Sequence, residues 1–104
     1  MQARHASVAS ADAALDVQRV QAVRKHLGDA VPLMVDANQQ WDRPTAQRMC
    51  RIFEQFNLVW IEEPLDAYDH EGHAALAAEF DTPIATGEML TSAGEHWDLI
   101  RLRA

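Results

Sequence analysis

Three carboxylates stand at equal spacing in the 104-residue chain, and each follows a short apolar run. Asp36 ends VPLMV, Glu62 ends NLVWI and Glu88 follows TPIATG, so that each acid lies 26 residues after the one before. Parallel strands need a crossover of a dozen or more residues, usually a helix, and a strand, a helix and two loops account for this spacing. The pattern therefore predicts three successive strand–helix units, each with an acid at the end of its strand.

Acids in these positions suggest a metal site. Functional groups of parallel α/β folds gather at the carboxyl ends of strands, where Asp36, Glu62 and Glu88 would meet. Their mutual repulsion would be relieved by a hard divalent cation such as Mg²⁺, which prefers oxygen ligands, whereas a trio without Cys or His disfavours zinc. The alternative is structural, with each acid serving as a helix cap or an ion-pair partner. Glu63 follows Glu62, and because side chains alternate along a strand, only one of the two is expected to face the centre easily.

The elements that must position these acids can be read from apolar periodicity and caps. A helix is predicted over about residues 13–27, with Asp12 as its N-cap and Gly28 as its stop. Further helices are expected after Asp42, after Asp69 and after Ser92, where Glu95 completes a capping box. The strands are expected at 32–35, 58–61 and 83–86, and the run LVWI (58–61) is apolar on both faces, which is typical of a parallel strand covered on both sides.

The resulting order, (β)αβαβαβα, predicts an α/β fold with a parallel sheet flanked by helices. Such a sheet is either open or part of a closed (β/α)₈ barrel, and a barrel takes about 250 residues. We expect three to four βα units of a partial barrel over residues 12–100. Residues 1–11 are expected to be an irregular tail, with at most one poor strand near 4–8, and residues 101–104 a second tail.

Composition excludes several classes of function. The net charge of −7 argues against a nucleic-acid partner, which would want a basic stripe. No apolar run approaches the roughly 20 residues of a membrane span, and the N-terminus lacks the apolar core of a signal peptide. A single cysteine, Cys50, rules out an internal disulfide and suits a cytoplasmic protein. No G-x-G-x-x-G is present, which disfavours an open-sheet nucleotide-binding module, and His70, Glu71 and His73 lack H-E-x-x-H spacing and are expected on the surface.

The motifs VDANQQW, WIEEP and TGEM resemble the enolase superfamily, and within it the mandelate racemase/muconate lactonizing enzyme-like group. The longer stretches DANQQWDRPTA, EQFNLVWIEEPLDAYDHEGHAALAA and DTPIATGEMLTS look most like acid-sugar dehydratases of the galactarate/talarate type. This resemblance implies a TIM-type barrel in which Asp36, Glu62 and Glu88 bind one Mg²⁺. It also implies that Asn38 lines the site near substrate and that Glu63 supports the ligands.

The resemblance further implies a reaction. Mg²⁺ would hold the carboxylate of an acid sugar while the proton α to it is removed, and loss of the β-hydroxyl would then give a 2-keto-3-deoxy acid; the enolase superfamily is a known case of Mg²⁺ paired with a Lys or His base. A racemase or cycloisomerase of the same group is the alternative activity.

The match departs from the family in two places. Where the family has Lys-x-Lys, this chain has His5, Ala6 and Ser7, and its one lysine is Lys25. The family's His-Asp pair lies on later strands than those present here. No catalytic residue is therefore assigned, and the chain is expected to be an inactive fragment, a truncated relic, or a metal-binding or interaction fragment. Open sheet edges would also favour self-association.

Overall fold

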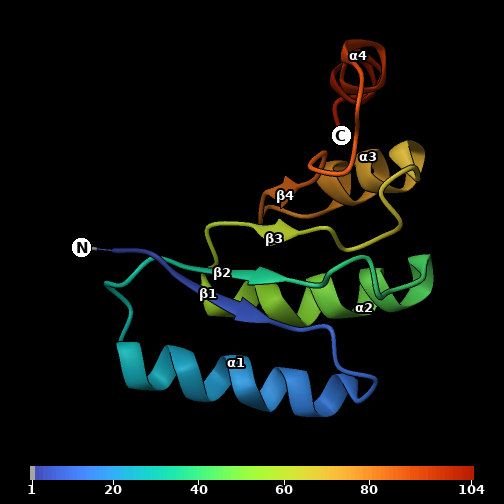
Figure 1. Ribbon diagram of the computed structural model, residues 1–104. Coiled ribbons are helices and arrows are strands. Elements are labelled where there is room, and N and C mark those ends of the chain that lie inside the picture. The colour runs from blue at the N-terminus through green and yellow to red at the C-terminus, as the bar shows by residue number, and fades with distance from the viewer. Residues whose placement is uncertain (1) are drawn as a thin grey trace.

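Four parallel strands form one sheet in the order β1-β2-β3-β4, and a helix follows each strand (Figure 1). The computed structural model describes residues 2–104. Its elements are β1 (Arg4–Ser7), α1 (Ala13–Leu27), β2 (Leu33–Asp36), α2 (Arg43–Phe53), the 3₁₀ turn η1 (Glu54–Phe56), β3 (Ile61–Glu62), α3 (His70–Glu79), β4 (Ile84–Ala85) and α4 (Ala93–Leu102). The predicted alternation of strands and helices and the parallel sheet are confirmed.

Each helix begins at a residue whose side chain accepts a hydrogen bond from a backbone N–H of the first turn. These N-caps are Asp12, Asp42, Asp69 and Ser92, as the sequence predicts. The side chain of Glu95 also accepts a hydrogen bond from the backbone N–H of Thr91, at 2.8 Å. Because every helix has its own start signal next to its strand, the loops that carry the acids are fixed at both ends.

The two faces of the sheet differ. Leu33 and Val35 of β2 and Ile61 of β3 are fully buried in the core, together with Phe53 of α2. The alternate residues, such as Asp36, are only half-buried. The sheet therefore packs its helices on the Leu33–Val35–Ile61 face and presents its acids on the other.

Three details differ from expectation or refine it. Residues 4–7, read from sequence as an irregular stretch or a poor strand, form β1, which pairs with β2 over four positions. Of the run LVWI, only Ile61 belongs to a strand. The sequence led us to expect that this run is covered on both faces, but Val59 is 39% exposed, because the helices pack on one face of the sheet only. His73, on α3, is fully buried and not on the surface. Among residues 2–104, no helix combines the length and apolar content needed to cross a membrane.

Candidate metal centre

The predicted acids do gather at the carboxyl ends of the strands. Asp36 and Glu62 are the last residues of β2 and β3, and they are direct partners in the parallel register. In the same row Glu62 is the partner of Ala85, the last residue of β4, and Glu88 follows three residues later. Three consecutive βα units thus end at one level, as their equal spacing predicts.

One group of three carboxylates lies within metal-binding reach. Asp36, Glu63 and Glu88 each offer an oxygen, and these oxygens lie within 4.8 Å of one another. Asp36 is half-buried, Glu63 is buried and Glu88 is exposed, so the group opens toward solvent on the Glu88 side. The structure therefore brings together Asp36 and Glu88, two of the three predicted ligands, with Glu63 within 4.8 Å of both.

The backbone explains why Glu63 points into this group. Regular alternation would send the side chain of Glu63 to the face opposite that of Glu62. Glu63 instead has φ of 43°, in the left-handed region that non-glycine residues seldom adopt. Its N–H donates to the carbonyl of Ala85 at 2.8 Å, and its own carbonyl accepts the N–H of Gln39 at 2.8 Å. These two neighbours hold the turn, and of the paired glutamates only Glu63 lies in the described group with Asp36 and Glu88.

The electrostatics of the group fit a divalent cation. Burial, followed by the adjacent Glu88 carboxyl and the charges of Asp36 and Glu62, raises the pKa of Glu63 to about 7. The Oε2 atom of Glu63 is buried without a hydrogen-bond partner in the described part of the chain. A carboxylate that lacks a partner and faces like charges is stabilised by a cation, and an all-oxygen donor set suits Mg²⁺.

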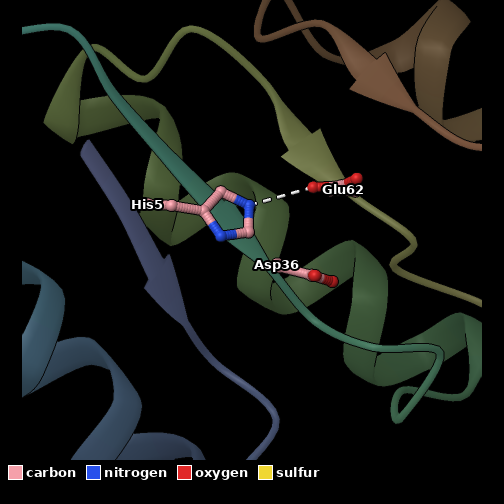
Figure 2. A group of neighbouring side chains, drawn as sticks. All are labelled: His5, Asp36 and Glu62. Carbon is pink, nitrogen blue, oxygen red and sulfur yellow. Dashed lines mark hydrogen bonds and ion pairs between the residues drawn. The ribbon is translucent and has the colours of Figure 1, made fainter. Parts of the chain in front are cut away.

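Glu62 belongs to a second group, with Asp36 and His5 (Figure 2). The imidazole of His5 reaches from β1 across β2, and its Nε2 lies 2.9 Å from Oε2 of Glu62. Asp36 is the member that the two groups share, whereas Glu62 and Glu88 fall in different groups within residues 2–104. Sequence reasoning gave His5 no assigned role; the signal that could have found it is its register, since His5 pairs with Met34, two residues before Asp36 and on the same side of β2.

Asn38, the remaining predicted site residue, contributes through its backbone. Its N–H donates to Oδ1 of Asp36 at 2.8 Å, and its carbonyl accepts from Nε2 of Gln40 at 3.1 Å. Asn38 and Gln39 both have positive φ, of 50° and 64°, which folds the loop back over the end of β2. The loop therefore orients the Asp36 carboxylate, while a contact of the Asn38 side chain with substrate stays a prediction.

The row of acids at the strand ends and the order of the units define a class of protein. The family described as "Enolase C-terminal domain-like" matches residues 2–104, and the chain belongs to this family. Its four parallel strands and their helices form part of a (β/α)₈ barrel, as predicted, since its solved relatives are barrel enzymes of this superfamily.

Individual relatives show which enzymes of this family the chain resembles. The L-talarate/galactarate dehydratase of Salmonella typhimurium LT2 is 70% identical over 93 residues, which are 89% of this chain and 23% of that enzyme. The crystal structure of L-talarate dehydratase from Polaromonas sp. JS666, complexed with Mg and L-glucarate, is 84% identical with a TM-score of 0.94, over 96% of this chain and 27% of that one. The 3,6-anhydro-alpha-L-galactonate cycloisomerase of Streptomyces coelicolor is 44% identical over 83% of this chain and 24% of that enzyme. The chain spans about a quarter of the length of these relatives.

Proposed function

We propose that this chain is the Mg²⁺-binding segment of an acid-sugar dehydratase of the talarate/galactarate type. The observation that carries the proposal is the gathering of acids at the ends of successive strands: oxygens of Asp36, Glu63 and Glu88 lie within 4.8 Å of one another, and Glu62 is the register partner of Asp36. It is supported by the 84% identity to a dehydratase structure that holds Mg and L-glucarate. The 44% identity to a cycloisomerase makes that activity the weaker alternative.

The ligand set has two members that both sequence and geometry select, Asp36 and Glu88. For the third, the sequence motif favours Glu62, and proximity to the other two favours Glu63. Glu62 is the register partner of Asp36, so its side chain rises from the adjacent strand at the same level. We propose Glu62 as the third ligand and Glu63 as the carboxylate that adds negative charge beside the centre.

The chemistry of the site follows from these residues. When bound, Mg²⁺ would hold the carboxylate of an acid sugar and offset the charge that develops as the α proton leaves. The chain's part is to fix the oxygens: Asp36 is held by the N–H of Asn38, and Glu63 is held by the backbone of Ala85 and Gln39. A proton acceptor is not assigned, because the positions of the family's Lys-x-Lys hold His5, Ala6 and Ser7.

This departure supports a second proposal for the isolated chain, a metal-binding segment without turnover. The first proposal, the dehydratase, names the kind of enzyme to which the segment belongs. The second, metal binding without turnover, describes what the segment does by itself. We therefore expect Mg²⁺ binding and no conversion of galactarate or talarate to a keto-deoxy acid.

Calorimetric titration with Mg²⁺ tests the site. The wild-type chain is expected to bind in the micromolar-to-millimolar range, and Asp36→Asn and Glu88→Gln are expected to abolish binding. Glu62→Gln and Glu63→Gln decide the third ligand, since the true ligand should cost more affinity. Glu71→Gln, an exposed neutralisation on α3, is the matched control and should leave binding unchanged. A folded wild-type chain that binds no Mg²⁺ would refute the proposal.

A further inference from the structure

We propose that Gln39 is a positioning residue of the metal centre, which acts by joining the loop after β2 to the turn after β3. This role rests on the proposed function, because the acids that it positions are those assigned there. Gln39 lies three residues after Asp36, and its backbone and side chain bind the two ends of the segment 63–67. One side chain therefore helps to set the distance between the acids of two neighbouring strands.

Gln39 makes two hydrogen bonds to this segment. Its N–H donates to the carbonyl oxygen of Glu63 at 2.8 Å, and its side-chain oxygen Oε1 accepts the N–H of Ala67 at 2.9 Å. Ala67 is only 2% exposed, so that removal of Oε1 would leave a buried donor that has lost its acceptor. The side chain of Gln39 is therefore the part of this connection that a substitution can remove while the backbone bond stays available.

The segment 63–67 is stiff enough to transmit the constraint. Four of its five residues are buried: Glu63, Pro64, Leu65 and Ala67. The ring of Pro64 fixes its own φ, and Glu63 has φ of 43°, a conformation that persists in non-glycine residues only where the surroundings enforce it. The two bonds from Gln39 are part of those surroundings, so they help to keep the carboxylate of Glu63 within the acid group.

The Asp36 side of the connection is fixed as well. Asn38 and Gln39 have positive φ, of 50° and 64°, and the N–H of Asn38 donates to Oδ1 of Asp36 at 2.8 Å. The N–H of Gln40 closes the same turn on the carbonyl oxygen of Ala37 at 3.0 Å. The carboxylate of Asp36 and the side chain of Gln39 thus belong to one tight turn, and a shift of this turn moves both.

Two cations of different size separate a positioning role from a purely structural one. Mg²⁺ demands near-ideal octahedral geometry with short bonds, whereas Ca²⁺ accepts longer bonds in a flexible arrangement. A loosened connection between the two loops should therefore weaken Mg²⁺ binding more than Ca²⁺ binding. A variant that only lowered the folded fraction would weaken both equally, because mass action treats the two ions alike.

Calorimetric titration of Gln39→Met with each ion tests the role. This variant keeps the length of the side chain but removes Oε1, and its Mg²⁺ affinity should fall about ten-fold or more while its Ca²⁺ affinity falls less. Gln47→Met is the matched control, because it removes the hydrogen bonds of an exposed glutamine on α2 to Glu79, and it should leave both affinities unchanged. An Mg²⁺-to-Ca²⁺ affinity ratio in Gln39→Met equal to that of wild type overturns the proposal.

A conservative variant adds a rescue. Gln39→Glu restores an oxygen that can accept the N–H of Ala67, and its added charge acts on both ions. The affinity ratio should therefore return toward the wild-type value, even if both affinities rise. A ratio in Gln39→Glu as low as in Gln39→Met overturns the proposal.

A measurement on the wild-type chain covers the case in which Gln39→Met does not fold. Coupling between two sites is reciprocal, so Mg²⁺ should slow the hydrogen exchange of the Ala67 amide. The reference is the amide of Phe80, which donates to the carbonyl oxygen of Leu76 at the end of α3 and should change less. Equal slowing at both amides, or none at Ala67, overturns the proposal.

Failure of this role can be told apart from failure of the proposed function. A folded wild-type chain that binds no Mg²⁺ refutes the proposed function, and the role of Gln39 falls with it. Mg²⁺ binding by the wild type, together with an unchanged affinity ratio in Gln39→Met, refutes the role of Gln39 alone and leaves the metal centre standing.

Discussion

The guanidinium of Arg24 on α1 donates its Nε proton to the carbonyl oxygen of Phe56, 3.0 Å away and 32 residues further along the chain. The same side chain donates to three more backbone carbonyls, at distances of 2.7–3.1 Å. These belong to Gly28, Val31 and Asn57. Arg24 is only 9% exposed, so one buried cation joins the end of α1 to the loops that enter β2 and β3.

We expect Arg24→Met to destabilise the fold by about 2–4 kcal/mol, because several buried carbonyls would lose a charged donor at once. Arg24→Lys should recover part of this loss, since an ammonium cannot reach all four oxygens in the arrangement of a planar fork. Urea unfolding followed by circular dichroism measures the difference. Lys25→Met, on the exposed side of the same helix, should change stability little; a similar effect of both Met variants would contradict the role of Arg24.

His73 predicts how stability depends on pH. Its Nδ1 lies 2.9 Å from the carbonyl oxygen of Asp69 and so donates its proton there, while Nε2 is buried without a partner in the described residues. Burial lowers the pKa of His73 below its usual 6.5 and outweighs the opposing contacts with Asp69. Between the lowered pKa and 6.5 the unfolded chain binds more protons than the folded one, so the free energy of unfolding should fall as pH drops below 6.5.

Urea unfolding between pH 7.5 and about 5 measures this dependence. His73→Leu should remove the fall in stability that His73 causes and leave the opposite contribution of Glu63, whose folded pKa of about 7 makes the free energy of unfolding rise as pH drops. His26→Leu should leave the slope as in wild type. An unchanged slope in His73→Leu would show that other groups cause the pH dependence.

Two glycines near helix starts should respond oppositely to alanine. A Cβ on Gly72 of α3 would overlap the carboxyl of Asp69 and lie 2.7 Å from Cδ1 of Leu65, whereas a Cβ on Gly94 of α4 would lie 4.0 Å from the nearest atom, Oγ of Ser92. Gly72→Ala should therefore cost about 1–2 kcal/mol despite better helix propensity. Gly94→Ala should gain up to about 0.5 kcal/mol. Thermal melts of the two variants check the difference in sign.

Open sheet edges predict self-association. Within residues 2–104, β1 and β4 each pair with one strand only, so that both outer edges of the described sheet carry backbone groups free to pair with another copy. Sedimentation velocity is expected to show a weight-average coefficient that rises with protein concentration. A single monomeric species at all concentrations would contradict the prediction.

Local signals were sufficient to predict the frame of the site. Helix starts depend on a cap residue and its next few neighbours, which is why the onset of α1 after Asp12 could be placed from the sequence. The meeting of Asp36 and Glu88 followed from equal spacing, because equal βα units bring strand ends to one level.

The parts that escaped prediction depend on contacts distant in sequence. Glu63 turns toward the acids because the backbones of Gln39 and Ala85 hold it in a left-handed conformation, and its own neighbours in the chain do not indicate this. His5 meets Glu62 only because its side chain spans the strand between them. The burial of His73 is likewise a result of helix packing and has no marker in its local spacing.

The order of the strands in the sheet is the order in which they are synthesised (Figure 1). The main contacts accordingly join successive units: β1 with β2, β2 with β3 and β3 with β4, and α1 with α2, α2 with α3 and α3 with α4. Such an arrangement can form vectorially, each unit docking on the one that left the ribosome before it. Asp36 and Glu62 then come level when β3 docks, and the group of Asp36, Glu63 and Glu88 is complete only after β4 and the turn that follows it have been added.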